Sequence, residues 1–234
     1  MKIFFVFIFS SIYLSAPAQQ FYNDAQLWLN LYLEKKISKK FALHLNQQDR
    51  WTQNVSQFEL AYADIGITYK VTKNVKVLGD YVMALKKKDN GIYSKRHQYY
   101  VALVVKKDFL KWRFMYRNML QLQNFDPYTR NDGYIQYIYD RHKVSIKYFA
   151  TKRFEFYVAE ELYLPLNNPQ LKTFERSRSF TGMFYNISKY QQLEFYFAFQ
   201  AELQKGYWYK QDKHYDNSLL KHDFIYGIGY SVYF

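Results

Sequence analysis

The chain has no cysteine among its 234 residues, and it contains only 8 glycines and 4 prolines. The absence of cysteine excludes disulfides, zinc–thiolate sites, iron–sulfur clusters and a cysteine nucleophile. The low glycine and proline content excludes collagen-like and low-complexity chains. Beyond the N-terminal segment, no apolar run approaches the roughly 18 residues that a transmembrane helix needs.

Aromatic and basic residues are abundant instead. Tyrosine, phenylalanine and tryptophan make up 22% of the chain, and 33 lysines and arginines against 20 acidic residues give a net charge of +13. Apolar residues account for 49% of the chain, yet its mean hydropathy is −0.45. The apolar residues are therefore interleaved with polar ones.

The N-terminus has the order of a secretory signal peptide. Met1-Lys2 carries a positive charge, Ile3–Leu14 is apolar except for two serines, and Ala16-Pro17-Ala18 supplies the small residues of a cleavage site. The apolar stretch is shorter than the about 20 residues that cross a bilayer as a helix, which argues against a membrane anchor. We predict a signal peptide over residues 1–18 and one domain over residues 19–234.

The rest of the chain alternates with a period of two. From Gln26 to Glu34 the leucines occupy every second position, and polar or aromatic residues stand between them. A helix would spread these leucines around its circumference, whereas a β-strand places them on one face. The same alternation recurs in eleven stretches, at about residues 26–34, 41–52, 58–70, 75–86, 97–106, 111–123, 134–150, 154–165, 176–187, 192–204 and 221–234.

Short turns alternate with longer polar connections, which predicts an up-and-down meander. Bacterial single-chain barrels usually have an even number of strands, so we expect ten or twelve rather than eleven. A hairpin that turns at Asp140–Lys143 would give twelve, and a first stretch outside the ring would give ten; we favour twelve. With the C-terminus at the periplasmic end, the longer connections are expected to be extracellular.

The charged polar face distinguishes a membrane barrel from a soluble one. Soluble barrels turn their apolar face inward, and packing many charges into a small core would cost several kcal/mol for each. An apolar outer face and a polar interior instead suit a barrel in lipid, where tryptophans such as Trp28 would sit in the interfacial girdles. The prediction is an all-β, transmembrane up-and-down antiparallel β-barrel of 10–12 strands in the bacterial outer membrane.

By this alternation, several charged side chains are expected to line the lumen. They could pair as a ladder that braces a narrow lumen, or they could line a pore that selects ions. Eight-stranded barrels are filled by side chains and those of about sixteen strands leave a channel, so ten to twelve strands leave both open. The candidates are Arg50, Asp64, Arg113, Arg117, Arg141, Glu161, Arg178, Glu194 and Glu202.

The chain ends on an aromatic residue. Tyr230, Val232 and Phe234 share the apolar face of the last expected strand. A terminal aromatic on an alternating strand resembles the signal that delivers bacterial outer-membrane proteins to the barrel assembly machinery. We expect that machinery to be a partner of this chain.

Three groups of residues resemble a known family. Together they are similar to an uncharacterised outer-membrane β-barrel family of Gram-negative bacteria, catalogued as a domain of unknown function. The resemblance implies fold and location but no activity, and it favours one long strand over residues 134–150. The groups are Leu27-Trp28 to Arg50-Trp51, Asp140-Arg141-His142-Lys143 to Glu160-Glu161-Leu162-Tyr163, and Arg176 and Arg178 followed by Gly182, Tyr185 and Ile187.

No catalytic or metal-binding motif is evident. The chain lacks Gly-x-Ser-x-Gly, His-Glu-x-x-His and P-loop sequences. His222-Asp223 is the one adjacent histidine–acid pair, and neighbouring residues of a strand face opposite sides. We therefore expect no catalytic residue, no metal site and no cofactor.

Lys86, Lys87 and Lys88 form a basic cluster beside one of the longer connections. We expect them at the level of the lipid headgroups, where they would attract phosphates of outer-leaflet glycolipid; a solvated loop is the alternative. Nucleic acid is a poor partner in this compartment, despite the basic charge.

The predicted role is structural or small-solute and ion transit, without catalysis. One alternative is an outer-membrane enzyme that acts on lipid or peptide at the extracellular rim. Another is a receptor or adhesion barrel that uses the tyrosine-rich segment 206–217.

Overall fold

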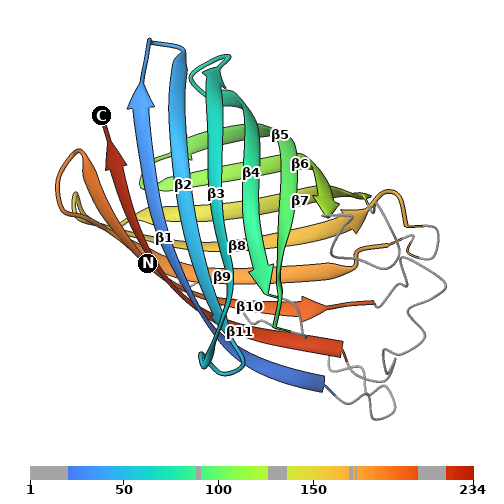
Figure 1. Ribbon diagram of the computed structural model, residues 1–234. Coiled ribbons are helices and arrows are strands. Elements are labelled where there is room, and N and C mark those ends of the chain that lie inside the picture. The colour runs from blue at the N-terminus through green and yellow to red at the C-terminus, as the bar shows by residue number, and fades with distance from the viewer. Residues whose placement is uncertain (1–20, 88–90, 126–135, 169–170, 172, 205–219) are drawn as a thin grey trace.

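The computed structural model describes residues 21–87, 91–125, 136–168, 171, 173–204 and 220–234. Eleven strands form one closed barrel in which each strand pairs with the next along the chain (Figure 1). The predicted signal peptide and the tyrosine-rich segment 206–217 lie outside the described residues. The strands are β1 (Phe21–Lys36), β2 (Phe41–Thr52), β3 (Gln57–Lys70), β4 (Val75–Lys87), β5 (Tyr93–Phe109), β6 (Trp112–Phe125), β7 (Gln136–Phe149), β8 (Phe154–Pro165), β9 (Arg176–Asn186), β10 (Gln191–Glu202) and β11 (Leu220–Tyr233).

The all-β barrel is confirmed, but the preference for an even number of strands is wrong. Residues 136–149 form the single strand β7, in which Arg141 pairs with Met119 of β6 and with Tyr163 of β8. The hairpin at Asp140–Lys143 therefore does not exist. The ten-strand alternative is also wrong, because β1 pairs with β2 on one side and with β11 on the other.

The odd strand number produces a parallel seam where the barrel closes. In an up-and-down meander the first and eleventh strands run in the same direction, so β1 and β11 pair in parallel from Phe21 and Leu220 to Glu34 and Tyr233. At the end of the seam, the Phe234 N–H donates to the Glu34 carbonyl oxygen at 2.8 Å. The chain is thus hydrogen-bonded to the barrel up to its last residue.

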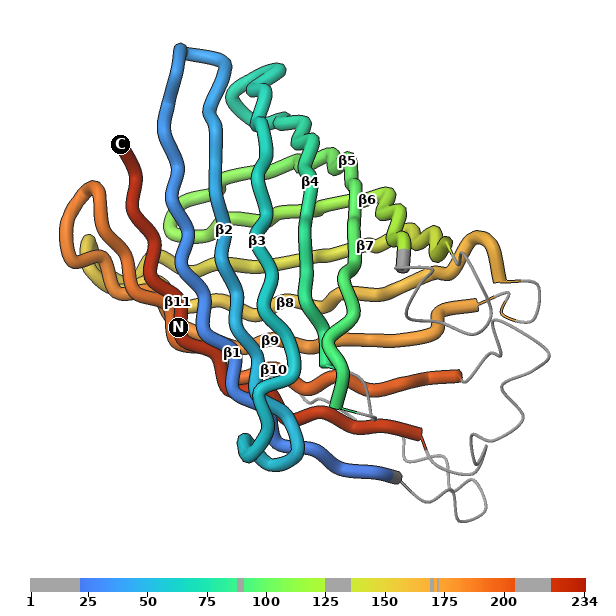
Figure 2. Tube along the Cα trace, in the orientation of Figure 1, coloured from blue at the N-terminus to red at the C-terminus, as the bar shows by residue number. Residues whose placement is uncertain are grey.

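The strand bounds give the two ends of the barrel connections of different length, and Figure 2 shows the turn between β1 and β2 at the same end as the C-terminus. One end, here the short-turn end, carries the last residue of β11 and the turns 37–40, 71–74, 110–111, 150–153 and 187–190. The opposite, long-loop end carries the first residue of β1 and the connections 53–56, 88–92, 126–135, 166–175 and 203–219. The predicted alternation holds for four of the five connections at the long-loop end; it is wrong for 53–56, which is as short as the turn 37–40.

Four of the short turns share a sequence and a hydrogen-bond pattern. In each, a serine or threonine hydroxyl accepts backbone N–H groups two or three residues further on, as Thr151 Oγ1 does from Arg153 (3.1 Å) and Phe154 (3.0 Å). Such local bonds fix tight turns. The repeated sequences are Ile37-Ser38-Lys39, Val71-Thr72-Lys73, Ala150-Thr151-Lys152 and Ile187-Ser188-Lys189.

Side chains sort onto two faces as the alternation predicts. On β5, Val101 and Leu103 are 59% and 42% exposed on the outer face, whereas Ala102 between them is 1% exposed. The prediction that Trp28 sits in an interfacial girdle is wrong. Its side chain lies inside the barrel with Ala198 and Ile225. No helix of the described residues is long and apolar enough to cross a membrane.

A disulfide tests the parallel seam cleanly, because the chain has no cysteine of its own. Asn30 pairs with Gly229, and a Cβ added to Gly229 would lie 3.8 Å from the Asn30 Cβ, a separation that suits a disulfide. We expect Asn30→Cys/Gly229→Cys to cross-link in the folded barrel, seen by non-reducing gel mobility and mass spectrometry. The control is Asn30→Cys/Tyr233→Cys, since Tyr233 pairs with Glu34 instead. A cross-link in the control pair alone would contradict the parallel register of β1 and β11.

Candidate functional site

A cavity of about 620 Å³ occupies the barrel interior, and residues from all eleven strands line it. Its lining includes eight basic and four acidic residues, a formal charge of +4. The charged lining residues are Arg50, Lys86, Arg96, Arg117, Arg141, Lys143, Arg176 and Arg178, with Glu59, Asp64, Glu161 and Glu194. The cavity lining is therefore polar and carries a net positive formal charge.

Four of the lining residues belong to a continuous row of inward side chains, here called the lumen row. Each member lies opposite the next across a strand pair, so strand register brings together residues that are distant in sequence. The row crosses seven strands, from β6 through β11 to β1. Its members are Arg117, Lys143, Glu161, Arg178, Gln200, Asp223 and Asp24.

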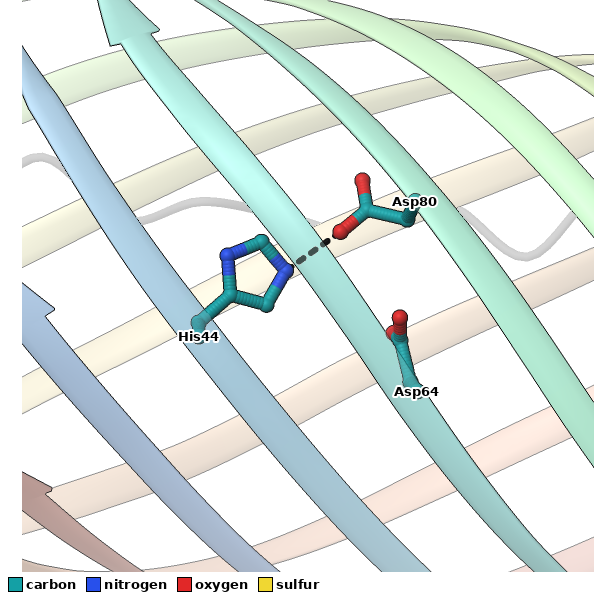
Figure 3. Close-up of side chains that lie close together, drawn as sticks. All are labelled: His44, Asp64 and Asp80. Atoms are coloured by element: carbon teal, nitrogen blue, oxygen red, sulfur yellow. Dashed lines mark ion pairs between the residues drawn. The ribbon is translucent and has the colours of Figure 1, made fainter.

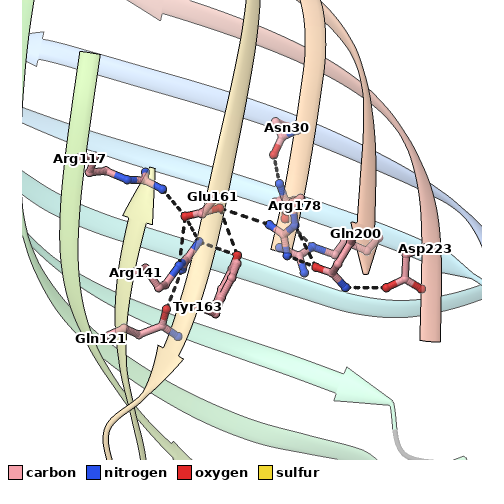
Figure 4. Close-up of polar contacts among 11 residues, drawn as sticks. Asn30, Arg117, Gln121, Arg141, Glu161, Tyr163, Arg178, Gln200 and Asp223 are labelled. Atoms are coloured by element: carbon pink, nitrogen blue, oxygen red, sulfur yellow. Dashed lines mark hydrogen bonds and ion pairs between the residues drawn. The ribbon is translucent and has the colours of Figure 1, made fainter. Parts of the chain in front are cut away.

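Within the row, Glu161 is 1% exposed, and several side chains converge on its carboxylate (Figure 4). Its Oε1 accepts hydrogen bonds from Nη2 of Arg117 at 2.6 Å and from Nη2 of Arg141 at 2.8 Å. Its Oε2 accepts the Tyr163 hydroxyl at 3.2 Å and lies 3.8 Å from Nη1 of Arg178. A buried carboxylate is costly unless it is paired and hydrogen-bonded, and here three guanidinium groups and a hydroxyl meet that requirement.

Arg178 extends this network to the neighbouring strands (Figure 4). Its Nε donates to Gln200 Oε1 at 2.9 Å, and Gln200 Nε2 donates to Asp223 Oδ2 at 2.6 Å. Asp223 Oδ1 in turn lies 3.0 Å from Lys221 Nζ. A chain of hydrogen bonds, with the 3.8 Å ion pair between Glu161 and Arg178 as one link, thus connects β6, β7, β8, β9, β10 and β11 from the inside.

Aromatic rings pack beside the charges. The Trp28 ring lies 3.7 Å from Cζ of Arg50 and 4.9 Å from Cζ of Arg178, within cation–π distance. Next to them, Tyr196 lies over Gly227, where a Cβ would fall 1.9 Å from the Tyr196 ring. Glycine at this position therefore makes room for the tyrosine ring.

Two cations of the lining have no carboxylate partner among the described residues. Lys143 Nζ lies 3.8 Å from the centre of the Phe180 ring, and Arg50 stacks on Trp28. No ion pair to a described acidic side chain accompanies either contact. Lys143 and Arg50 are therefore cations of the cavity wall that form no direct ion pair with a carboxylate of the described residues.

Most of the predicted lumen residues line the cavity, namely Arg50, Asp64, Arg117, Arg141, Glu161, Arg178 and Glu194. Arg113 and Glu202 do not. Arg113 lies towards the short-turn end, where its Nε is 2.6 Å from Asp108 Oδ1. Glu202 lies at the long-loop end of β10 and accepts the Lys221 N–H at 3.0 Å.

The three lysines predicted to lie at the lipid headgroups, Lys86, Lys87 and Lys88, do not all take the expected position. Lys86 lines the cavity, and its Nζ lies 3.1 Å from Glu59 Oε1, so it does not face headgroups as expected. The error arises because Lys86 shares the inward face of β4 with Ala84 and Val82. Lys87 ends β4, and Lys88 lies outside the described residues.

Sequence reasoning missed Lys143, Arg176 and Tyr163. Lys143 stands two positions after Arg141, and Arg176 two before Arg178, so the period of two would have placed both inside. Tyr163 stands in the same relation to Glu161. Because a turn was expected at Asp140–Lys143, the spacing of Lys143 from Arg141 was not taken as that of a strand.

The adjacent pair His222-Asp223 is divided between the two faces of β11. The His222 ring packs against Phe199 at 5.2 Å between centroids, whereas the Asp223 carboxylate accepts Gln200 inside the barrel. The two groups therefore do not face one site, as the alternation indicates.

Comparison with known proteins places the chain in a family. A family described as a protein of unknown function, DUF2490, matches residues 25–214. The chain belongs to the DUF2490 family. This confirms the resemblance to a family without assigned activity. No curated protein matches this DUF2490 member. Among solved structures, a NanC porin matches with 12% sequence identity and a TM-score of 0.49, over 85% of this chain and 94% of that chain.

Removing the Glu161 charge should destabilise this DUF2490 barrel. Glu161→Gln keeps the size of the side chain but leaves the guanidinium groups around it without their shared counter-ion. We expect a loss of about 3 kcal/mol in the free energy of unfolding, measured by urea unfolding in vesicles with tryptophan fluorescence. Glu160→Gln is the matched control, because Glu160 is the next residue and lies on the outer face. Equal losses in both variants would contradict the central role of Glu161.

Proposed function

We propose that this chain is an integral outer-membrane barrel whose lumen passes small anionic solutes, without a catalytic step. The proposal has two parts, the membrane location and the preference for anions. Each rests on a different face of the barrel.

The outer face supports the membrane location. Every strand has between 11 and 17 residues, and about 9–11 residues of a tilted strand cross a bilayer. The outward positions carry exposed apolar side chains on strand after strand, such as Leu31 on β1, Ile65 on β3 and Val158 on β8. A closed barrel also satisfies its backbone hydrogen bonds internally, as lipid requires.

The C-terminal strand supports the same location. Tyr230, Val232 and Phe234 share its outward face, and Phe234 is 67% exposed at the short-turn end. These residues are accessible to the barrel assembly machinery that we propose as a partner. With that end in the periplasm, the long-loop end faces the exterior.

The inner face supports the preference for anions, and one observation carries it: the formal charge of +4 on the cavity lining. Charged rings in narrow pores select ions of opposite sign. Lys143 and Arg50 are the strongest candidates for direct contact with an anion, because they lack a carboxylate partner among the described residues. Arg117 and Arg141 are already bound to Glu161.

The test is the reversal potential of the refolded barrel in a planar bilayer under a potassium chloride gradient. We expect stable current steps and a reversal potential of the sign that chloride selectivity gives. Lys143→Gln should move it towards zero, because the variant removes a positive charge from the cavity lining. Lys39→Gln makes the same change in the exposed turn 37–40 and should leave it unchanged.

Two results would contradict the proposal. One is cation selectivity of the parent barrel. The other is the absence of current from protein whose gel mobility shifts on heating, which marks it as folded.

A further inference from the structure

A second polar cluster lies on the wall formed by β2, β3 and β4 (Figure 3). His44 of β2 pairs with Gly66 of β3, and Gly66 pairs with Asp80 of β4, so these three positions form one row. Asp64 stands two residues before Gly66 on the same inward face. None of these residues belongs to the lumen row.

The ligating atoms of His44, Asp64 and Asp80 all lie within 4.8 Å of one another. His44 Nε2 contacts Asp80 Oδ1 directly above the glycine. A Cβ added to Gly66 would lie 1.6 Å from that oxygen and 2.5 Å from His44 Nε2. The absence of a side chain at Gly66 is therefore what allows the imidazole and the carboxylate to meet.

The cluster has more buried negative charge than its partners neutralise. The side chains of Asp80 and His44 are 0% and 4% exposed, and Asp64 is 6% exposed. Asp64 Oδ2 accepts a hydrogen bond from the Tyr100 hydroxyl at 2.6 Å, but the buried Asp64 Oδ1 and Asp80 Oδ2 have no hydrogen-bond partner among the described residues. Among the described residues, no lysine or arginine forms an ion pair with either carboxylate. Two buried carboxylates at this separation repel each other unless one of them is protonated or a cation joins them.

We propose that His44, Asp64 and Asp80 bind a divalent transition-metal ion. His44 Nε2 and one oxygen from each carboxylate are the ligands, and the ion replaces the proton that His44 and Asp80 share in its absence. One imidazole and two carboxylates suit Zn²⁺ or Mn²⁺, whereas Mg²⁺ and Ca²⁺ prefer all-oxygen sites. Asp64 also lines the cavity, which gives the ion a route in and leaves a coordination position for water. This site is separate from the proposed anion preference and does not depend on it.

The experiment uses the refolded full-length barrel, stripped with a chelator and titrated with Zn²⁺. We expect one ion per chain by calorimetry and elemental analysis. Co²⁺ should give visible absorption bands as a second readout. Asp64→Asn and His44→Gln should each weaken binding at least about 10-fold and abolish the Co²⁺ bands, while heat-shifted gel mobility verifies folding.

The matched control is His142→Gln. His142 Nε2 lies 3.1 Å from Asp140 Oδ2, so it forms a second histidine–aspartate pair, but no third ligand of the described residues completes it. This variant should bind Zn²⁺ as the parent does. The proposal is overturned if the parent binds no stoichiometric ion, or if Asp64→Asn and His44→Gln bind it unchanged. Neither result would alter the reversal potential that tests the anion preference.

Discussion

Glu161 is a carboxylate buried inside a closed barrel, and the basic side chains of β6, β7 and β9 are arranged around it. Arg117, Arg141 and Arg178 converge on this one acid. The carboxylate is therefore fully paired, whereas the three arginines share a single negative charge. The network therefore connects six strands from the inside and still leaves a net positive charge on the cavity lining. From the sequence, the inward charges could either brace the lumen as ion pairs or select ions. In this geometry the same side chains are compatible with both roles.

The strand count shows where a general rule conflicts with the residues. The alternation identifies eleven stretches, and eleven strands form the barrel. Asp140 and His142 made β7 resemble a turn, because polar side chains interrupt its outer face. In the structure these two residues pair with each other at 3.1 Å, and Asn118 of β6 also bonds to Asp140. A polar patch on the outer face, and not a turn, explains the sequence.

The face of each side chain was predictable, but its partners were not. A period of two places Arg117 and Glu161 inside, yet they are 44 positions apart, and only the register of β6, β7 and β8 brings them together. The same limit applies to His44 and Asp80, which meet across Gly66. The repeated Ser/Thr-Lys turns, in contrast, were present in the sequence as a local signal that marks four of the five short turns.

We propose that the barrel encloses an open space where Lys143 and Arg50, which form no ion pair with a described carboxylate, meet small anions. A crystal structure of the detergent-solubilised barrel soaked in bromide, with bromide located by anomalous scattering, tests this proposal. We expect bromide inside the cavity beside Lys143 Nζ or the Arg50 guanidinium. A lumen filled by side chains, or bromide found only on the outer surface, would contradict it.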